Sequence, residues 1–563
     1  MNLLRRTFAR GHWLIAFFIF ASILVQAAPS PQDRATLVRA ILSEEADQAG
    51  WVSKLSSSAD PWVSQALAAW RGGEVFIHEA DGIKTPFLLD KQTDAEGKAR
   101  AVRIADGEPL RDAAGQALSF VASELTAVDT SRALRKVIKE TSDLMSLANP
   151  DPKFRSDAAS RLGFEQNLEL LPFFEVRLKT ENEPAVRKAL AEAIAITQLA
   201  SENPEVRKTG ARGLGQLRSI SGQTLLRKME AECKAAPNGR DEEMLTIAHS
   251  ALAEIEEHIF WGNMAGTIFR GLSLGAVLLI AALGLAITFG LMGVINMAHG
   301  EMIMVGAYAA YVTQNFFKGW FGESGLGFDL YFPAALVVSF TSAAVMGLIL
   351  ERGVVRFLYA RPLESLLATW GVSLVLQQTF RAYFGAANVF VASPSWLRGT
   401  YTASDVLFAY NRIFGIAFAA LIVLASYFLL TRTNIGLQIR AVMQNRQMAA
   451  CMGVSTERMN MITFAYGSGL AGLAGACLAQ IGNVGPSLGQ SYIVDCFMVV
   501  ALGGVGNMMG TVSASLGMGV TDQILQMNVQ AVLAKVIVLA GVILFLQWRP
   551  AGLFVTRSRS LEG

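Results

Sequence analysis

The sequence predicts an all-α protein in two parts: a mostly helical domain with a small β patch, followed by a polytopic membrane bundle of about seven to nine spans. Residues 30–258 are rich in Glu, Arg, Lys and Ala and contain no apolar run long enough to cross a bilayer. From Ile268 onward, apolar runs of spanning length recur between short loops that contain arginine. The average composition of the 563 residues, 52% hydrophobic and 17% charged, therefore combines two unlike halves.

The first residues have the pattern of a secretory signal peptide, which we place at residues 1–28. Arg5, Arg6 and Arg10 precede the apolar run 13–25, and Val-Gln-Ala at 25–27 ends in a small residue that signal peptidase accepts. The run is short for a membrane span, so cleavage is favoured over the alternative of an uncleaved anchor. Residues 29–258 are then expected to form a domain in the periplasm.

Two patterns predict the fold of that domain. Residues 31–73 are typical of two or three helices ending at Arg71-Gly-Gly, and three β-prone stretches separated by turn residues follow within 74–107. Residues 150–257 are helical and carry a weak repeat that resembles HEAT-type helical repeats, with an ordinary helical bundle as the alternative. We expect stacked helices to bury three residues of each unit: Phe154, Ala159 and Leu162; Val186, Ala191 and Ile194; Val206, Ala211 and Leu214.

The orientation of the membrane half follows from counting crossings. Six apolar runs occupy residues 268–292, 302–317, 331–350, 366–384, 413–430 and 461–481. With residue 258 outside, the arginine-bearing loops and the basic tail at Arg549 to Arg559 all face the cytoplasm, in agreement with the positive-inside rule. This parity requires one or three further crossings within 493–547, where Gly503, Gly504, Gly506 and Gly510 favour a broken or tightly packed segment.

Polar residues in or beside the spans are candidates for a solute path, because an ionised side chain at the membrane centre costs about 3 kcal/mol. The candidates are Asn296, His299, Glu301, Thr369, Trp370, Gln377 and Asp495. We expect His299 and Glu301 near the cytoplasmic face and Asp495 near the outer edge, where water could solvate them. Trp370 and Gln377 are seven residues apart, so they share a helix face and could offer an aromatic plane and an amide to a neutral solute, although core packing is also open for Trp370.

A polar segment, Asn434 to Val454, lies between two of the apolar runs and should therefore lie at a membrane face. Its inner part, Arg440 to Cys451, has no glycine or proline and is expected to form a short amphipathic helix. We interpret the segment as a contact site for another protein.

Several function classes are disfavoured. The chain lacks a G-x-x-x-x-G-K-[ST] phosphate-binding loop, and no second histidine stands near His299 to complete a zinc site, so we expect neither a bound cofactor nor a metal in this chain. The net charge of +2 and the scattered arginines do not indicate a nucleic-acid partner. An enzymatic function is disfavoured for the same reasons.

Several separate motifs resemble one known family. They include TFGLMGVINMAHGEMIMVGAY (288–308), ERGVVRFLYARPL (351–363), GGVGNMMGTVSASLG (503–517) and RPAGLF (549–554). In order and spacing they resemble the LivH-type permeases of branched-chain amino acid ABC importers over residues 265–555. Within that family, INMAHGEM combined with an exported N-terminal domain resembles the UrtB-type permease of urea ABC importers.

The resemblance implies a transport subunit of the bacterial inner membrane, with a cytoplasmic C-terminus, that works by alternating access. Its implied partners are a second, related permease, two ABC ATPase subunits that bind ATP and magnesium, and a periplasmic solute-binding protein. The segment 434–454 would dock on the ATPase through Arg440, Asn445, Met448, Ala449, Ala450 and Gly453. Urea, and possibly short amides, is the implied solute; a branched-chain amino acid permease and a passive small-solute channel are the alternatives.

Overall fold

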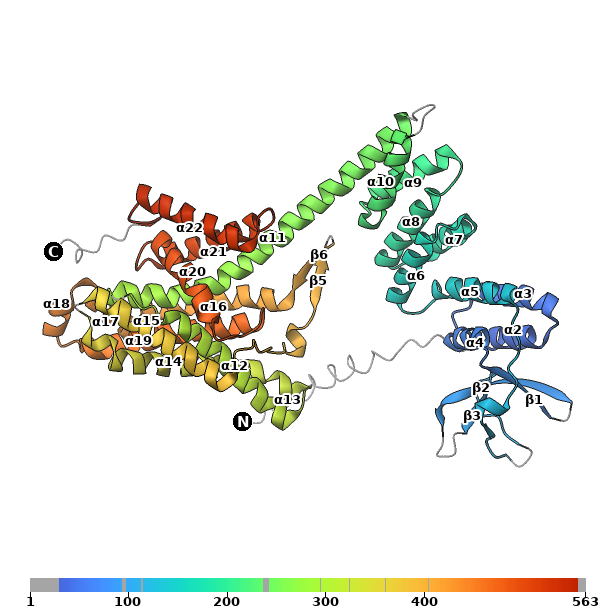
Figure 1. Cartoon of the computed structure of the whole chain (residues 1–563), viewed down its shortest axis with the longest axis horizontal. Helices are drawn as coiled ribbons and strands as arrows, with labels where there is room; N and C mark the ends of the chain where they lie inside the picture. Colours follow the sequence, from blue (N-terminus) through green and yellow to red (C-terminus); the bar gives the residue numbers. More distant parts are fainter. Residues whose placement is uncertain are drawn as a thin grey trace, which may run out of the picture. The chain divides into compact units, whose positions relative to one another are not determined.

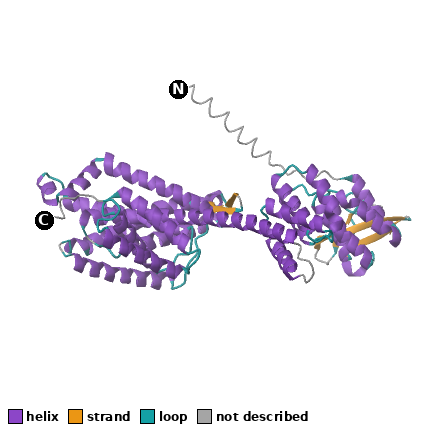
Figure 2. Cartoon of the chain, turned by 90° about the horizontal axis from the view of Figure 1, so that it is seen from above, coloured by secondary structure: helices purple, strands orange, loops and turns teal. Residues whose placement is uncertain are grey.

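The computed structural model describes residues 30–554, apart from residues 81, 94–97, 113–114, 236–241, 294, 324, 360 and 404. The predicted signal peptide, residues 1–28, lies outside the described residues. The chain divides into two compact units, Met1–Ile259 and Phe260–Gly563. Helices form most of both units, with strands confined to one sheet and one hairpin (Figure 2).

The first unit begins with helices packed beside a sheet (Figure 1). The helices are α2 (Pro31–Leu42), α3 (Glu45–Ser53), α4 (Pro61–Gly72) and α5 (Arg132–Ser146). Ser30 and Asp60 cap α2 and α4 with their side chains, and a proline occupies the first turn of each helix, where no amide hydrogen is needed. Gly73 ends α4 in the left-handed region (φ 77°), as predicted from Arg71-Gly-Gly.

The predicted β patch is an antiparallel four-stranded sheet in the order β1-β2-β3-β4. Its strands are β1 (Val75–Ala80), β2 (Ile83–Thr93), β3 (Ala99–Arg103) and β4 (Ser119–Phe120). Consecutive residues of a strand face opposite sides of the sheet, so Val75 joins the helical core while Phe76 packs with Phe87 and Ala101 in a second cluster on the other side. The three β-prone stretches are therefore confirmed as strands.

The remainder of the first unit is helical, as predicted. It consists of α6 (Pro152–Phe164), α7 (Leu171–Thr180), α8 (Pro184–Gln198), α9 (Pro204–Gln216), α10 (Gln223–Ala235) and the start of α11 (Glu242–Met292). The helix α8 packs against α6, α7 and α9. Gly163 lets α6 approach α8 closely, because a Cβ there would lie 2.6 Å from Cα of Ala193.

The predicted buried positions of the repeat are partly confirmed. Ala159 and Leu162 of α6 and Ala211 and Leu214 of α9 are buried, whereas Phe154 is 61% exposed and its predicted burial is wrong. Phe154 lies in the first turn of α6, before the helix reaches its neighbours. In α8 the face is shifted: Ala189, Leu190 and Ala193 are buried, while Ala191 and Ile194 are only partly covered, because α8 packs between helices on two sides. The HEAT-like repeat stays an interpretation.

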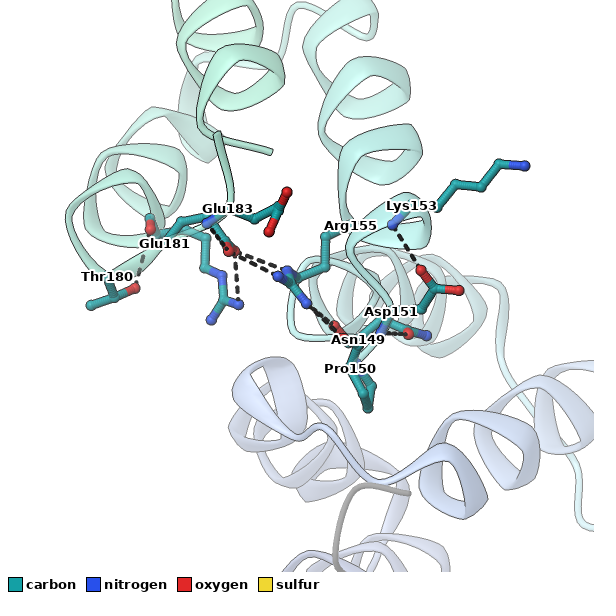
Figure 3. A network of polar contacts seen from close by, with 9 residues as sticks. Asn149, Pro150, Asp151, Lys153, Arg155, Thr180, Glu181 and Glu183 are labelled. Carbon is teal, nitrogen blue, oxygen red and sulfur yellow. Dashed lines mark hydrogen bonds and ion pairs between the residues drawn. The ribbon is translucent and has the colours of Figure 1, made fainter. Parts of the chain in front are cut away.

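A buried ion pair ties the start of α6 to the turn between α7 and α8 (Figure 3). Arg155 donates to both carboxylate oxygens of Glu181, at 2.9 and 2.8 Å, and to the carbonyl oxygens of Asn149 and Pro150. Arg177 adds a further contact to Glu181 at 3.2 Å. The arginine of the sequence repeat thus has a definite structural role in the first unit.

The second unit is the predicted helical bundle, and its fold class is confirmed. After α11 it contains α12 (His299–Phe321), α13 (Leu326–Asp329), α14 (Tyr331–Gly353), α15 (Pro362–Phe384), α16 (Tyr410–Arg432), α17 (Asn434–Gln444), α18 (Arg446–Cys451), α19 (Thr456–Ala479), α20 (Leu488–Gly503), α21 (Met508–Leu525) and α22 (Ala531–Trp548). Within the described part of the chain, five helical segments are long and apolar enough to cross a membrane: Glu242–Gly290, Leu326–Phe357, Tyr410–Arg432, Thr456–Ala479 and Ala531–Trp548.

Glycines set the centre of this bundle, where α12, α14 and α19 pack against one another (Figure 1). A Cβ at Gly306 would collide with the backbone of Gly472, and a Cβ at Gly472 would collide with the carbonyl oxygen of Ser339. Gly475 lies equally close to the backbone of Ile303. These glycines therefore allow backbone-to-backbone packing of three helices, as expected for small residues at this spacing.

The last stretch, 493–547, contains three helices rather than one. The break between α20 and α21 falls in the glycine cluster, where Gly504 and Gly506 have positive φ (95° and 78°) and Gly503 packs on the backbone of Gly510. The predicted broken segment is thus confirmed. A hairpin of β5 (Thr400–Ala403) and β6 (Val406–Ala409) precedes α16 and was not predicted.

Candidate functional site

A buried polar stripe runs along one face of α15. Its residues are spaced four apart, which places them one above another on the helix: Ser365, Thr369, Ser373 and Gln377. All four are buried, and Thr369 Oγ1 accepts the amide hydrogen of Met297, just before α12, at 3.1 Å. Two of these residues, Thr369 and Gln377, were predicted as candidates; Ser373 and Ser365 were missed.

Glu301 of α12 is the acidic centre of this stripe. The hydroxyl of Ser373 and the side-chain amide of Gln377 both donate to its Oε1, each at 2.8 Å. Glu301 is 1% exposed, and its Oε2 has no partner among the described residues. The site therefore holds one carboxylate oxygen firmly and leaves the other available as a hydrogen-bond acceptor.

Glu301 and His299 both contact neighbouring helices far from the ends of those helices. Ser373, the partner of Glu301, lies eleven residues after Pro362, halfway along the 23 residues of α15 and about 16 Å from the start of that helix. His299 Nε2 lies 3.0 Å from the carbonyl oxygen of Ala281, eleven residues before the end of α11. The expected location of this pair near the cytoplasmic face stays a prediction.

The chain reaches these contacts by folding back after α11. Gly293 has a positive φ (65°), which permits a sharp turn after Met292. Asn296 then accepts the amide hydrogen of Ala298 at 3.0 Å and so shapes the entry into α12. Asn296 therefore has a structural contact, while its Nδ2 has no partner among the described residues.

His299 and Glu301 do not form one site. Residues two positions apart in an α-helix are rotated about the helix axis by about 200°, so the side chains of His299 and Glu301 point to nearly opposite sides of α12. His299 points toward α11 and Glu301 toward α15. Only Glu301 joins the polar stripe.

Trp370 also lies apart from the stripe. Its side chain is 50% exposed, whereas Gln377 is buried against Glu301. This exposure matches neither an aromatic platform beside the buried Gln377 nor a packed core residue. Trp370 belongs to the exposed face of α15.

Asp495 lies in the middle of α20 and has a partner that the sequence reading missed. Lys535 of α22 donates to Asp495 Oδ2 at 3.1 Å and contacts the carbonyl oxygen of Ser491 at 3.3 Å. Asp522 of α21 lines the same small cavity. Because these residues lie on three helices, no local sequence pattern could have joined them. The positive charge of Lys535 balances the carboxylate of Asp495 inside the bundle. Asp495 therefore belongs to a different polar cluster from Glu301, whose partners are Ser373 and Gln377.

The polar segment 434–454 forms two helices, α17 and α18, instead of the single helix predicted over 440–451. Asn445 separates them, because it takes an extended conformation (φ −157°, ψ 104°) and caps α18 by accepting the amide hydrogen of Met448. One face packs on α19 through a cluster of Ile439, Val442, Ala449 and Met459.

The predicted docking residues divide into two groups. Asn445 caps α18, Ala449 is buried, and Gly453 ends α18 with a positive φ (86°) while donating to the carbonyl oxygen of Ala450. Arg440, Met448 and Ala450 are exposed, with Met448 at 61%. The first group shapes the segment, and the second forms its accessible face.

Apolar helices of spanning length, with a buried polar stripe inside the bundle and an exposed amphipathic segment, form the architecture expected of a polytopic membrane protein. Residues 267–546 match the family model of the permease component of branched-chain amino acid transport systems. This membrane half therefore belongs to the LivH-type family of ABC permeases.

Individual relatives support the assignment. The chain is 27% identical over 301 residues to the high-affinity branched-chain amino acid permease LivH of Escherichia coli K12, covering 51% of this chain and 94% of that protein. It is 26% identical to BraD of Pseudomonas aeruginosa, over 45% of this chain and 84% of that protein. It is also 28% identical to a putative glucose ABC transporter permease of Haloferax volcanii, over 42% of this chain and 70% of that protein. No solved structure matches.

Proposed function

We propose that this chain is the permease subunit of an ATP-driven importer for urea and short amides. The observation that carries the proposal is the membership of residues 267–546 in a family of ABC permeases. The chemistry of Glu301 supports the solute class: a carboxylate oxygen without a partner, beside a hydroxyl and an amide, accepts N–H groups of a neutral solute.

The runner-up is a branched-chain amino acid permease, the function named for the relatives LivH and BraD. Such a solute is a zwitterion, so its carboxylate requires a donor or a cation in the path. The described hydrogen bonds of Glu301 come from Ser373 and Gln377, both uncharged, so the stripe supplies nothing that pairs with a carboxylate strongly. A carboxylate at Glu301 also accepts the ammonium group of an amino acid, so uptake measurements decide between the two solutes.

The mechanism we propose is alternating access driven by partner subunits. Two ATPases dock on the exposed face of α17 and α18, and a second permease completes the membrane unit. ATP binding changes the relative stability of the outward-facing and inward-facing states, because a ligand shifts an equilibrium only when it binds two states differently. The first unit, placed in the periplasm, recruits or orients a solute-binding protein.

Uptake by the complete transporter in reconstituted vesicles tests the proposal. We expect ATP-dependent uptake of labelled urea that excess acetamide inhibits and excess leucine does not. Inhibition by leucine together with ATP-dependent leucine uptake would establish the runner-up instead. Urea entry into vesicles that lack the ATPase subunits would indicate a passive channel.

A further inference from the structure

Three helices and one loop converge on the side chain of Tyr359, in the connection between α14 and α15. Its hydroxyl donates to Oε1 of Glu351 at 2.5 Å, and Glu351, in the last turn of α14, is 2% exposed. The guanidinium of Arg446, the first residue of α18, lies over the tyrosine ring at 4.8 Å from its centroid. Asn460 of α19 is buried, and its side chain lies close to the hydroxyl.

The two functional parts of Tyr359 contact different elements. The ring face attracts the Arg446 cation. The hydroxyl holds a buried carboxylate, which is the stronger class of hydrogen bond. Burial and the neighbouring Glu351 raise the pKa of Tyr359, so its hydroxyl keeps the proton that it donates. A single side chain thus joins an exposed helix to a buried one.

The cluster is only partly satisfied. Glu351 Oε2 and Asn460 Nδ2 have no hydrogen-bond partner among the described residues, although both are buried. An unsatisfied buried polar group is unfavourable, so each of these atoms gains from a new partner. A small displacement of the Tyr359 side chain would change which of these atoms are paired, so this arrangement is suited to a contact that rearranges.

We propose that Tyr359 is a positioning residue that transmits displacement of α18 to α14 and α19. The proposal rests on the proposed docking of ATPases on α17 and α18, and it names the route by which their motion enters the bundle. When an ATPase moves α18, Arg446 moves the tyrosine ring, and the hydroxyl then moves Glu351 and the end of α14.

Substitutions can separate the ring from the hydroxyl. Tyr359→Phe keeps the ring beneath Arg446 but removes the bond to Glu351, whereas Tyr359→Leu removes both contacts. Arg446→Gln removes the cation and leaves the tyrosine–glutamate bond. Arg356→Gln is the matched control, because Arg356 lies in the same loop and pairs with Glu457 of α19 at 3.2 Å, but both side chains are exposed and such pairs contribute little.

The first measurement is the number of ATP molecules hydrolysed per labelled urea taken up by reconstituted complex. We expect Tyr359→Phe and Arg446→Gln each to raise this ratio at least about fivefold, the lower range of an allosteric coupling, with Tyr359→Leu raising it further. Arg356→Gln should stay within about twofold of wild type. Wild-type ratios for the Phe and Leu variants would overturn the proposal.

The second measurement does not depend on the solute. Hydrogen–deuterium exchange of the purified complex is followed at the end of α14 and at α18, with and without ATP. In the wild type, ATP should change exchange at both places; in Tyr359→Leu it should change α18 alone. Equal changes at α14 in both proteins would refute the role of Tyr359. If the wild type takes up no urea, the proposed substrate fails, while this measurement still decides the role of Tyr359.

Discussion

Glu301 is held by two donors from one helix, and both hydrogen bonds end on the same carboxylate oxygen. Gln377 and its neighbour Gln378 make the significance of these bonds measurable. The two glutamines are chemically identical and adjacent, yet Gln377 is buried against Glu301 while Gln378 lies on the exposed face of α15. Substituting each glutamine in turn therefore compares a buried position with an exposed one while the residue type stays the same.

We expect Gln377→Leu to lower urea uptake at limiting solute by about tenfold or more, because losing a hydrogen bond to a charged group costs about 1.5–3 kcal/mol. Gln378→Leu should leave uptake within about twofold of wild type, since no buried carboxylate depends on it. The initial rate of labelled urea uptake, normalised to inserted protein, checks both. Equal uptake in the two variants would show that the stripe on α15 only supports packing.

Glu181 provides a residue-scale test in the first unit. Burial alone would raise the pKa of Glu181, but the hydrogen bond from Arg155, the backbone amide of Glu183 and the charges of Arg155 and Arg177 outweigh burial and lower it. Since the folded pKa is below the unfolded one, the ion pair stabilises the fold above about pH 4.3, and this contribution is lost as the pH falls further.

We therefore expect Glu181→Ala to cost about 3 kcal/mol at neutral pH, because it leaves Arg155 buried without its partner. The difference from wild type should shrink as the pH falls below about 4.3, because the unfolded wild type then binds a proton at Glu181 that the folded protein takes up only at lower pH. The free energy of unfolding, measured from proteolysis between α6 and α8 at increasing concentrations of urea as denaturant, tests this. A difference that stays constant from pH 7 to pH 3.5 would contradict the assignment of the lowered pKa.

At this scale the sequence indicated the right residue types more readily than their partners. Thr369 and Gln377 stood out as polar groups in a span, but serine is common at helix contacts, so Ser373 was missed despite its regular spacing of four from both. Lys535 was missed because its partner Asp495 lies 40 residues earlier on another helix. Pairings across helices depend on tertiary packing, which periodicity within one helix does not contain.

Among the elements, α17 and α18 were predictable as amphipathic, but the break between them was not. Asparagine is a preferred N-cap residue but also occurs inside helices, so the sequence alone did not show that Asn445 begins a new helix. The fold-back at Gly293 before α12 was also not predicted, because hydropathy alone does not reveal it.

Gly453 is the position where the end of α18 can be tested. Proline there requires φ near −65° and removes the amide hydrogen that bonds to Ala450, whereas the native φ is 86°. We expect Gly453→Pro to leave the protein inserted and to abolish ATP-dependent uptake. Gly453→Ala should be mild, since a Cβ there has open space and the strain is only about 1–2 kcal/mol.

Arg440 tests the accessible face of the same segment. It is exposed, so reversing its charge alters what a partner meets without disturbing the packing on α19. We expect Arg440→Glu to insert normally and to lower the ATPase activity that co-purifies with the complex by at least about tenfold, the effect of about 1.4 kcal/mol in affinity. If both single variants, Arg440→Glu and Gly453→Pro, keep wild-type uptake and ATPase activity, this segment is not part of the coupling route.

For the whole molecule, the main question is what the first unit contributes. The family match covers residues 267–546 and leaves residues 30–258 outside it. If the first unit recruits a solute-binding protein, deleting residues 30–258 while keeping export should lower uptake at limiting urea and have little effect when urea and binding protein are saturating. Unchanged uptake at limiting urea would refute recruitment.

The two-part organisation was the most predictable feature, because a bilayer imposes long apolar runs that a water-soluble domain does not tolerate. The sheet was also predictable, since its strands are separated by glycine-containing turns. The exposed Phe154 shows the limit of the repeat pattern: the same sequence position is buried in α8 as Val186, but in α6 it lies in an uncovered first turn.

The glycine contacts between α12, α14 and α19 also bear on how the bundle can move. Backbones that touch through Gly306, Gly472 and Gly475 have no side chains that could change rotamer, so these three helices must travel as a rigid body. The hydrogen bonds between Glu301 and α15 can instead be exchanged for others. We therefore expect the hinge of the transport cycle at the boundary of α15, with the solute taking the place of the bonds that open there.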